Sequence, residues 1–224
     1  MSIHLEGRLA LVTGASRGLG AAIAKRFAAE GAHVILIART QGGLEEVDDA
    51  IRAAGGQATL APLDLYEADK IDMVAASIHQ RFGKLDILVG AAAQLGVLSP
   101  AHHIDAKTWD RTLFLNLTVN QRLIRAFDPL LRLSDSGRAI FPTCEAGSVP
   151  KAFWSAYAAS KAGLEALVKC YSMELAKSPV EAHLIDPGPM ATKLRQEAYP
   201  GEPPDTQIDP EDAGVTDLFV EAAV

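Results

Sequence analysis

A tyrosine and a lysine stand four residues apart in the segment 157–161, Tyr-Ala-Ala-Ser-Lys. Apolar residues at 164, 167, 168, 171 and 175 follow with a helical period, which predicts that both side chains lie on one helix face, one turn apart. An ammonium group beside a phenol favours the tyrosinate, so we expect a pKa of Tyr157 below the usual value of about 10 and proton transfer at neutral pH. Chance alone gives about 0.16 such pairs in a chain of this composition, so the spacing needs other support.

Glycines are concentrated in the segment 13–20, Thr-Gly-Ala-Ser-Arg-Gly-Leu-Gly. A buried strand is predicted just before it, at 9–13, and a helix just after it, in which Leu19, Ile23 and Phe27 recur until Gly31. Glycines at such a turn let the backbone approach a pyrophosphate, while free N–H groups and the positive end of the helix stabilise the anion. The segment therefore predicts a dinucleotide-binding turn, with a ligand-free glycine turn as the alternative.

These segments belong to a regular alternation of strands and helices that extends from Arg8 to Pro187. Further strands are predicted at 34–38, 59–64, 85–90, 138–144 and 180–186, and helices at 44–54, 67–82, from Asp105 to the Ser-Asp-Ser-Gly run at 134–137, and through 164–175. Such alternation is typical of a parallel sheet covered by helices on both faces. We expect a single domain over 1–224, with a proline-rich lid at 188–210, a short helix at 192–198 and a final helix at 211–222.

Composition and charge exclude several classes of protein. The chain has 224 residues, 49% of them hydrophobic, a net charge of −7 and scattered basic residues, which disfavours a nucleic-acid partner. The most apolar stretch, 87–98, is too short to span a membrane, and the first eight residues lack the pattern of a secretory signal, so we expect a cytoplasmic protein. Neither Cys144 and Cys170 nor the histidines have metal-ligand spacing, so no metal site is predicted.

Together and in this order, the glycine turn, the Tyr-Ala-Ala-Ser-Lys segment and the segment 187–192, Pro-Gly-Pro-Met-Ala-Thr, resemble the short-chain dehydrogenase/reductase family. The resemblance covers nearly the whole chain. It implies an α/β fold with a doubly wound parallel Rossmann sheet of strand order 3-2-1-4-5-6. It also implies a nicotinamide cofactor and a tetrad of Asn, Ser, Tyr and Lys that moves a hydride and a proton between the cofactor and a carbonyl or secondary alcohol.

The resemblance assigns three of the four tetrad positions directly. Tyr157 is implied to be the acid/base, and Lys161 to hold the nicotinamide ribose hydroxyls and tune Tyr157. Asn116 matches the tetrad amide, which in the family anchors a water that feeds the lysine. A purely structural asparagine between helices is the alternative, because Asn120 lies on the same helix face and could serve the same packing role.

Cofactor contacts are implied at the glycine turn, at strand ends, at the Tyr-Lys pair and in the 187–192 segment. They are Thr13, Gly14, Ser16, Arg17, Gly18, Leu19, Gly20, Arg39, Asp64, Leu65, Tyr157, Lys161, Pro187, Gly188 and Thr192. Asp64 could equally cap a helix. The second strand ends in Ala38-Arg39-Thr40 without a carboxylate, and Arg17 with Arg39 resembles the pattern that binds a 2′-phosphate. We therefore expect NADP, with NAD possible and solvated arginines as the alternative.

The chain departs from the family in three places. Cys144 stands thirteen residues before Tyr157, where the family has its serine, and Thr143 cannot replace it because neighbours on a strand face opposite ways. Cys144 is either a weak hydrogen-bond donor to substrate or a small apolar filler. Gly-Ala-Ala-Ala at 90–93 replaces Asn-Asn-Ala-Gly, and the family's last strand is missing, so the sheet edge is either exposed or covered by 211–222.

These features favour an NADP(H)-dependent oxidoreductase that acts on a small-molecule carbonyl or secondary alcohol. The alternative is a cofactor-binding protein with little turnover that acts as a regulator or partner module. In the family, the helices before and after the strand at 138–144 commonly form a dimer, and the missing strand removes a surface that family tetramers use. We therefore expect a homodimer.

Overall fold

The computed structural model describes residues 4–224 and contains one six-stranded parallel sheet of order β3-β2-β1-β4-β5-β6. The predicted strand order is thus confirmed. The strands are β1 (Leu9–Thr13), β2 (His33–Ala38), β3 (Gln57–Pro62), β4 (Ile87–Val89), β5 (Arg138–Pro142) and β6 (Glu181–Ile185). The main helices are α1 (Gly18–Ala29), α2 (Gln41–Ala53), α3 (Asp69–Phe82), α4 (Ala106–Leu113), α5 (Val119–Leu131), α6 (Ser155–Glu174), α7 (Lys193–Ala198) and α8 (Ala213–Ala223).

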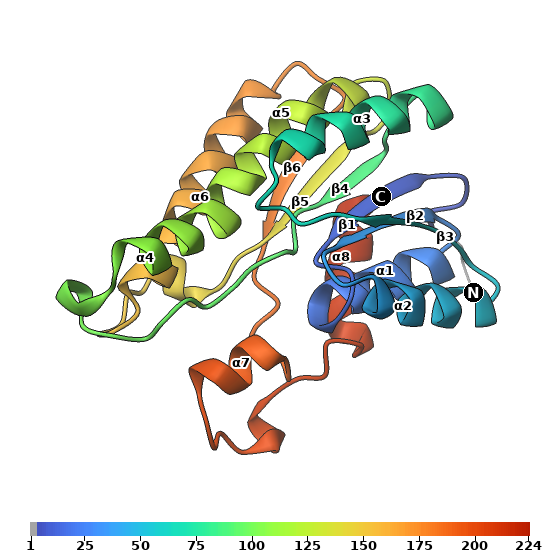
Figure 1. The fold of residues 1–224 in the computed structure, drawn as a ribbon. Helices are drawn as coiled ribbons and strands as arrows, with labels where there is room; N and C mark the ends of the chain where they lie inside the picture. Colours follow the sequence, from blue (N-terminus) through green and yellow to red (C-terminus); the bar gives the residue numbers. More distant parts are fainter. Residues whose placement is uncertain (1–3) are drawn as a thin grey trace.

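Helices cover both faces of the sheet, which explains why its central strands are apolar throughout (Figure 1). One core lies between the sheet and α1, α2 and α8, with Phe27 and Phe219 fully buried. The other lies between the sheet and α3, α5 and α6, with Phe127 and Phe141 fully buried. Figure 1 shows α7 set apart from these two layers, within the segment that follows β6.

Several predicted boundaries need correction. The third strand ends at Pro62, so Asp64 lies in the following loop rather than on the strand. The helix predicted from Asp105 is interrupted by a π-helical turn, Phe114–Thr118, between α4 and α5. This turn shifts the helix register, and Trp109, expected on the buried side, is 37% exposed. A continuous 3.6-residue period cannot anticipate such an insertion.

The final helix does not cover the sheet edge. α8 packs against α1 and over β5 and β6, on the face of the first core. The Arg8 guanidinium stabilises the C-terminal end of α8 by donating to the carbonyl of Ala223 at 2.5 Å. β6 therefore remains the edge strand, paired only with β5 among residues 4–224.

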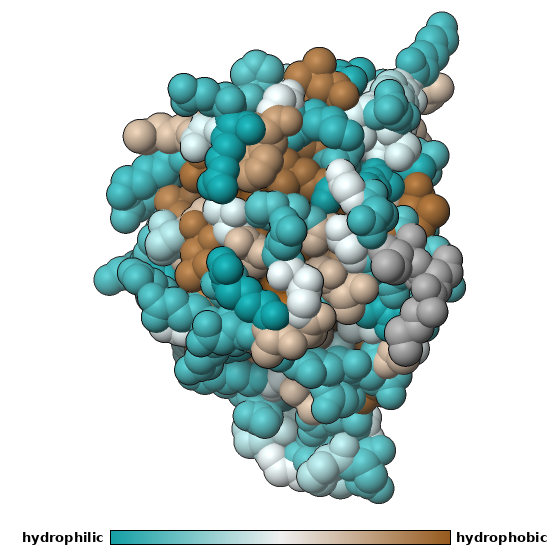
Figure 2. All heavy atoms as spheres, turned by 90° about the vertical axis from the view of Figure 1, so that its right-hand side faces the viewer, coloured by the Kyte–Doolittle hydropathy of each residue, from teal (hydrophilic) through white to brown (hydrophobic). Residues whose placement is uncertain are grey.

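Figure 2 shows the side of the molecule that bears β3, where hydrophilic atoms dominate and hydrophobic atoms surface in separate patches. No helix within residues 4–224 is long and apolar enough to cross a bilayer. Nor does the described part of the chain contain a group of three or more His, Cys, Asp and Glu side chains placed to hold a metal ion.

Candidate active site

The glycine turn forms a cradle at the carboxyl end of β1. Gly14 and Gly18 have φ of 68° and 56°, a conformation that favours glycine. A Cβ on Gly20 would lie 2.4 Å from the carbonyl oxygen of Gly14, so only glycine allows α1 to approach the strand this closely. The N-cap residue, Arg17, gives no side-chain hydrogen bond to the helix. The first N–H groups of α1 are thus available to an anion, and the cradle fits a pyrophosphate.

Two neighbouring segments complete the cradle. Thr13 is fully buried, and its hydroxyl donates to the carbonyl of Val89 at 3.3 Å and accepts from the N–H of Ala92 at 3.2 Å. This hydroxyl joins the ends of β1 and β4. The methyl group of Thr192, which caps α7, would lie 3.4 Å from a Cβ on Gly18. The structure therefore brings the 187–192 segment to the glycine turn, although 172 positions separate Gly20 from Thr192.

Tyr157 and Cys144 meet at the same end of the sheet as the cradle, where the strands have their carboxyl ends. Tyr157 is 6% exposed in the first turn of α6, and the thiol of Cys144 lies 3.7 Å from the phenol oxygen. Thr143 faces away and donates to Glu165 at 2.8 Å. The prediction that Thr143 cannot stand in for Cys144 agrees with this geometry, because Cys144 and Thr143 point to opposite sides of the extended segment.

The expected fall in the pKa of Tyr157 is wrong for this structure. Burial raises the pKa of Tyr157 well above its usual value, and nearby Cys144 and Asp186 act in the same direction. The amino group of Lys161 donates to the carbonyl of Pro142 at 2.9 Å and lies 5.9 Å from the centre of the tyrosine ring. Burial also lowers the pKa of Lys161. Desolvation of both groups outweighs their helical proximity, and sequence spacing does not report burial.

Asn116 lies buried in the π-helical turn with its side-chain amide fully hydrogen-bonded. Its nitrogen donates to the carbonyl of Gln94 and to the hydroxyl of Ser160, and its oxygen accepts from the N–H of Gln94, each at 2.9 Å. The hydroxyl of Ser160 in turn donates to the carbonyl of Tyr157 at 2.7 Å. Asn116 therefore joins the loop after β4 to the turn of α6 that carries Tyr157.

Asn120 fills the space left by the altered turn after β4. Its amide nitrogen donates to the carbonyl of Asn116 at 2.8 Å. A Cβ on Gly90 would lie 2.4 Å from its amide oxygen, so Asn120 and a side chain at position 90 cannot coexist in this arrangement. The departure at 90–93 is thus matched by an amide that reaches the same place from α5.

The remaining predicted cofactor residues surround the cradle in different ways. Arg17 and Arg39 are exposed, and within residues 4–224 neither guanidinium forms an ion pair. Asp64 accepts from the N–H of Tyr66 at 3.0 Å, whereas the Leu65 side chain is buried in the second core, which leaves only its backbone free for a ligand. The others lie near the turn or open the lid: Ser16 faces Gly43, Leu19 packs on the first core, and Pro187 precedes Gly188, which has φ of 78°.

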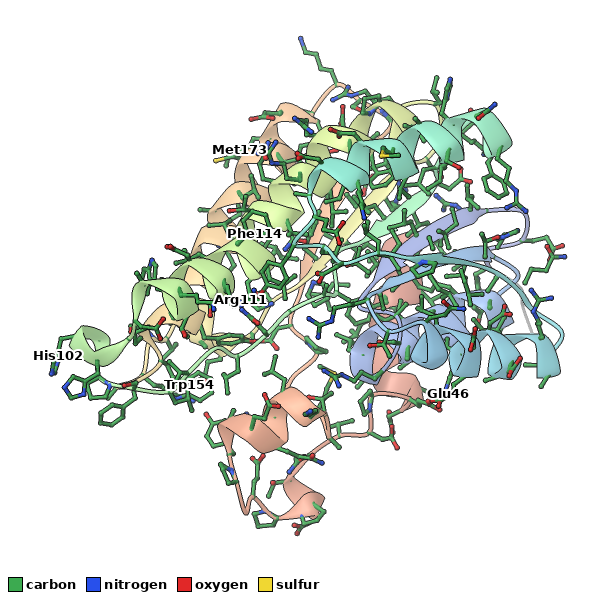
Figure 3. All side chains as sticks on the ribbon, in the orientation of Figure 1. Glu46, His102, Arg111, Phe114, Trp154 and Met173 are labelled. Atoms are coloured by element: carbon green, nitrogen blue, oxygen red, sulfur yellow. The ribbon has the colours of Figure 1, made fainter. Side chains whose placement is uncertain are left out.

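Three residues near Tyr157 escaped the sequence prediction. Asp186, which precedes the 187–192 segment, adds to the rise in the pKa of Tyr157 and opposes the fall that burial causes in the pKa of Lys161. Trp154 and Tyr199 pack beside the phenol with ring centres 5.4 Å apart (Figure 3, where Trp154 is labelled). The adjacency of Asp186 to a motif was an available signal. Nothing in the spacing of Trp154 and Tyr199 indicates their contact, because they are 45 positions apart.

Comparisons with known proteins agree with this architecture. Residues 8–203 match the family model described as short chain dehydrogenase. The 2,3-dihydro-2,3-dihydroxybenzoate dehydrogenase of Bacillus subtilis is 31% identical over 200 residues, which is 88% of this chain and 76% of that protein.

Solved structures extend the likeness to three dimensions. A short chain dehydrogenase of Pseudomonas syringae superposes with a TM-score of 0.95 at 34% identity, covering 100% of this chain and 91% of that one. One from Escherichia coli CFT073, complexed with NADPH, has a TM-score of 0.94 at 30% identity and covers 100% and 93%. The family match extends from β1 to beyond α7 and so includes the glycine turn and the part of α6 that carries Tyr157. The chain therefore belongs to the short-chain dehydrogenase family.

Proposed function

We propose that this protein is an NADP(H)-dependent oxidoreductase that interconverts a carbonyl compound and a secondary alcohol, with Tyr157 as the acid/base. The observation that carries the proposal is the buried Tyr157 phenol with the Cys144 thiol 3.7 Å away. Both lie at the carboxyl end of the sheet, which also holds the glycine cradle. This arrangement suits a reaction in which a proton and a hydride reach one carbonyl group from two sides.

The protonated phenol acts as the acid in the direction of reduction. Burial raises the pKa of Tyr157, with Cys144 and Asp186 acting in the same direction, so the phenol carries its proton at neutral pH. The hydroxyl donates that proton to the carbonyl oxygen of the substrate, and the alcohol leaves. In the reverse direction the deprotonated phenol accepts the alcohol proton.

Lys161, Cys144 and Asn116 assist Tyr157 in different ways. Lys161 presents a buried amino group near the phenol. This amino group would hold the ribose hydroxyls of a bound nucleotide. The Cys144 thiol lies 3.7 Å from the phenol oxygen and would donate a weak hydrogen bond to a substrate oxygen bound there. Asn116 positions the turn of α6 that carries Tyr157, through Ser160.

The cradle and the exposed arginines would hold the cofactor. Gly14, Gly18 and Gly20 would accommodate the pyrophosphate at the start of α1, where Thr192 approaches Gly18 from the lid. Arg17 and Arg39 would receive the 2′-phosphate of NADP. The NADPH complex of the related protein from Escherichia coli supports this choice. When bound, the nicotinamide supplies or accepts the hydride.

The alternative is a cofactor-binding protein with little turnover that serves as a regulator or partner module. The replacement of the serine by Cys144 and the altered turn at 90–93 favour it. Both proposals predict NADPH binding, so only turnover separates them.

A cofactor-oxidation screen tests the proposal. The purified protein is incubated with NADPH and a set of ketones, aldehydes and quinones, and absorbance at the nicotinamide band is followed alongside Tyr157→Phe. We expect the wild type to reduce at least one carbonyl compound, and the Tyr157→Phe variant to reduce none of them. Tight NADPH binding with no reduction of any compound would favour the alternative.

We infer in addition that the protein acts as a homodimer through α5 and α6. The outer face of α6 carries small exposed residues, Ala159, Ala162 and Ala166, which allow a second helix to approach closely. Both cysteines are free thiols, which is compatible with the reducing cytoplasmic location that we expect.

A further inference from the structure

A third apolar cluster lies outside the two cores, around the Tyr157 phenol. Leu95, Ala146, Tyr157 and Ala198 are buried in it, and Leu98, Cys144, Trp154, Leu194 and Tyr199 pack against them. These residues come from the loop after β4, the turn after β5, the start of α6 and the α7 segment. A compound that reaches the phenol must therefore lie among apolar side chains.

Trp154 and Tyr199 form the aromatic wall of this cluster. The centre of the Trp154 ring system lies 5.9 Å from that of Tyr157 and 5.4 Å from that of Tyr199. Two cations flank this wall. Lys151 donates to the Tyr199 hydroxyl at 3.4 Å and pairs with Glu145 at 3.2 Å. The Arg195 guanidinium lies 4.0 Å from the centre of the Tyr199 ring and pairs with Glu202 at 2.6 Å. Because Glu145 pairs with Lys151 and Glu202 with Arg195, neither cation is left unpaired for an ionised substrate.

Phe153 directly precedes Trp154 in the chain and lies outside the cluster. It is 57% exposed and is the one non-glycine residue within 4–224 that has a positive φ, 73°. Its carbonyl accepts from the N–H of Ser99 at 3.0 Å, which joins this segment to the loop after β4. Exposing the aromatic ring to water and holding the backbone at positive φ are each unfavourable. Strained backbone conformations are concentrated at functional sites such as ligand clamps, and exposed apolar patches mark binding surfaces. Val97 and Val149, 40% and 51% exposed, lie on the two joined segments.

We propose that the site takes uncharged carbonyl compounds with an extended apolar body, an alkyl chain of several carbons or an aromatic ring, and that Phe153 determines specificity by binding the end remote from the carbonyl. The inference rests on the proposed function for the position of the carbonyl at Tyr157. Trp154 and Tyr199 contact the middle of the substrate, and Phe153 the part beyond them. Figure 3 shows Trp154 on the side of the molecule that faces the α7 segment, with Met173 toward the other end of α6.

A homologous series of 2-alkanones from 2-butanone to 2-decanone, with NADPH as the reductant, tests the substrate class. Each buried methylene is worth about fourfold in binding, so we expect kcat/KM to rise about threefold to fourfold per carbon over the first several members, through KM rather than kcat. A flat or falling series, or a preference for a carboxylated ketone of equal length, would overturn the inference.

Tryptophan fluorescence keeps this test separate from the proposed function. If no ketone, aldehyde or quinone of the screen is reduced, the oxidoreductase proposal fails, and titration of the NADPH-saturated protein with 2-decanone and 2-butanone still decides the inference. We expect 2-decanone alone to change the emission, and the change to disappear in Trp154→Phe. Equal responses to both ketones, or none to either, would contradict an apolar site.

Variants at Phe153 test its own contribution. Phe153→Ser should raise KM for 2-decanone about tenfold and leave kcat and the KM for 2-butanone unchanged. Phe153→Gly removes the ring while suiting the positive φ, so it should give the same KM change without a lower melting temperature. The control is Leu133→Ser, which removes a side chain of equal exposure, 57%, just beyond the end of α5. If the Phe153 and Leu133 variants behave alike, Phe153 has no role in specificity.

Discussion

At the scale of single residues, the contact between Cys144 and Tyr157 limits the proposed chemistry. A thiol donates a weaker hydrogen bond than a hydroxyl, so the oxygen that develops negative charge is less well stabilised. We expect Cys144→Ser to raise the single-turnover rate on an accepted carbonyl about tenfold or more, because a lost donor at such a site costs about 2.7–4 kcal/mol. Tyr157→Phe should abolish turnover and leave NADPH affinity nearly unchanged. A serine variant no faster than wild type would make Cys144 an apolar filler.

The cofactor preference also belongs to individual side chains. Arg17 and Arg39 are exposed and, within residues 4–224, form no ion pair, so a 2′-phosphate gains both without breaking an existing contact. Because a charge-assisted hydrogen bond is worth about 1.5–3 kcal/mol, one net contact predicts NADPH binding at least about tenfold tighter than NADH. Calorimetry on wild type and Arg39→Ala measures this, with Arg52→Ala on α2 as the control. Equal affinities for the two nucleotides would contradict it.

At the scale of elements, Asp86 ties together the starts of β1 and β4 and the segment that precedes β5. Its carboxylate is buried and accepts from Lys84 at 2.8 Å, from the N–H of Leu9 at 2.9 Å and from Ser134 at 2.5 Å. Burial alone would raise the pKa of Asp86, but these hydrogen bonds outweigh it and the pKa lies below its usual value. A lowered folded-state pKa stabilises the fold above the unfolded-state value, about 4, and this contribution is lost as the pH falls through the folded-state pKa.

We therefore expect Asp86→Asn to lower the free energy of unfolding by about 1–3 kcal/mol at pH 7 and by less below pH 4, because an amide does not titrate. Urea denaturation at both pH values measures the difference. Asp72→Asn removes the exposed ion pair with Arg125 and should change stability by less than about 0.5 kcal/mol at either pH. A loss for Asp86→Asn that is the same at both pH values would refute the linkage to its pKa.

At the scale of the whole molecule, the small exposed residues on α6 predict how two chains assemble. A dimer through α5 and α6 leaves β6 free, and we expect light scattering to give about 47 kDa, twice the 23.7 kDa of one chain. Ala162→Arg should give monomers, because an arginine cannot fit between closely packed helices. Ala53→Arg, on the exposed side of α2, is the matched control and should stay dimeric. A wild-type mass of a monomer or a tetramer would contradict this assembly.

The sequence by itself determined the order of elements, the strand order through its family resemblance, and the residues of the glycine turn and the Tyr-Lys pair. Local rules suffice there, because apolar periodicity and turn-forming glycines act over a few residues. Only the tertiary structure decided the raised pKa of Tyr157 and the exposure of Trp109. It also decided that the Asn120 amide lies against Gly90 and that Trp154 and Tyr199 form one apolar wall. Each of these depends on desolvation or on contact between segments distant in the chain, and neither quantity is encoded in local spacing.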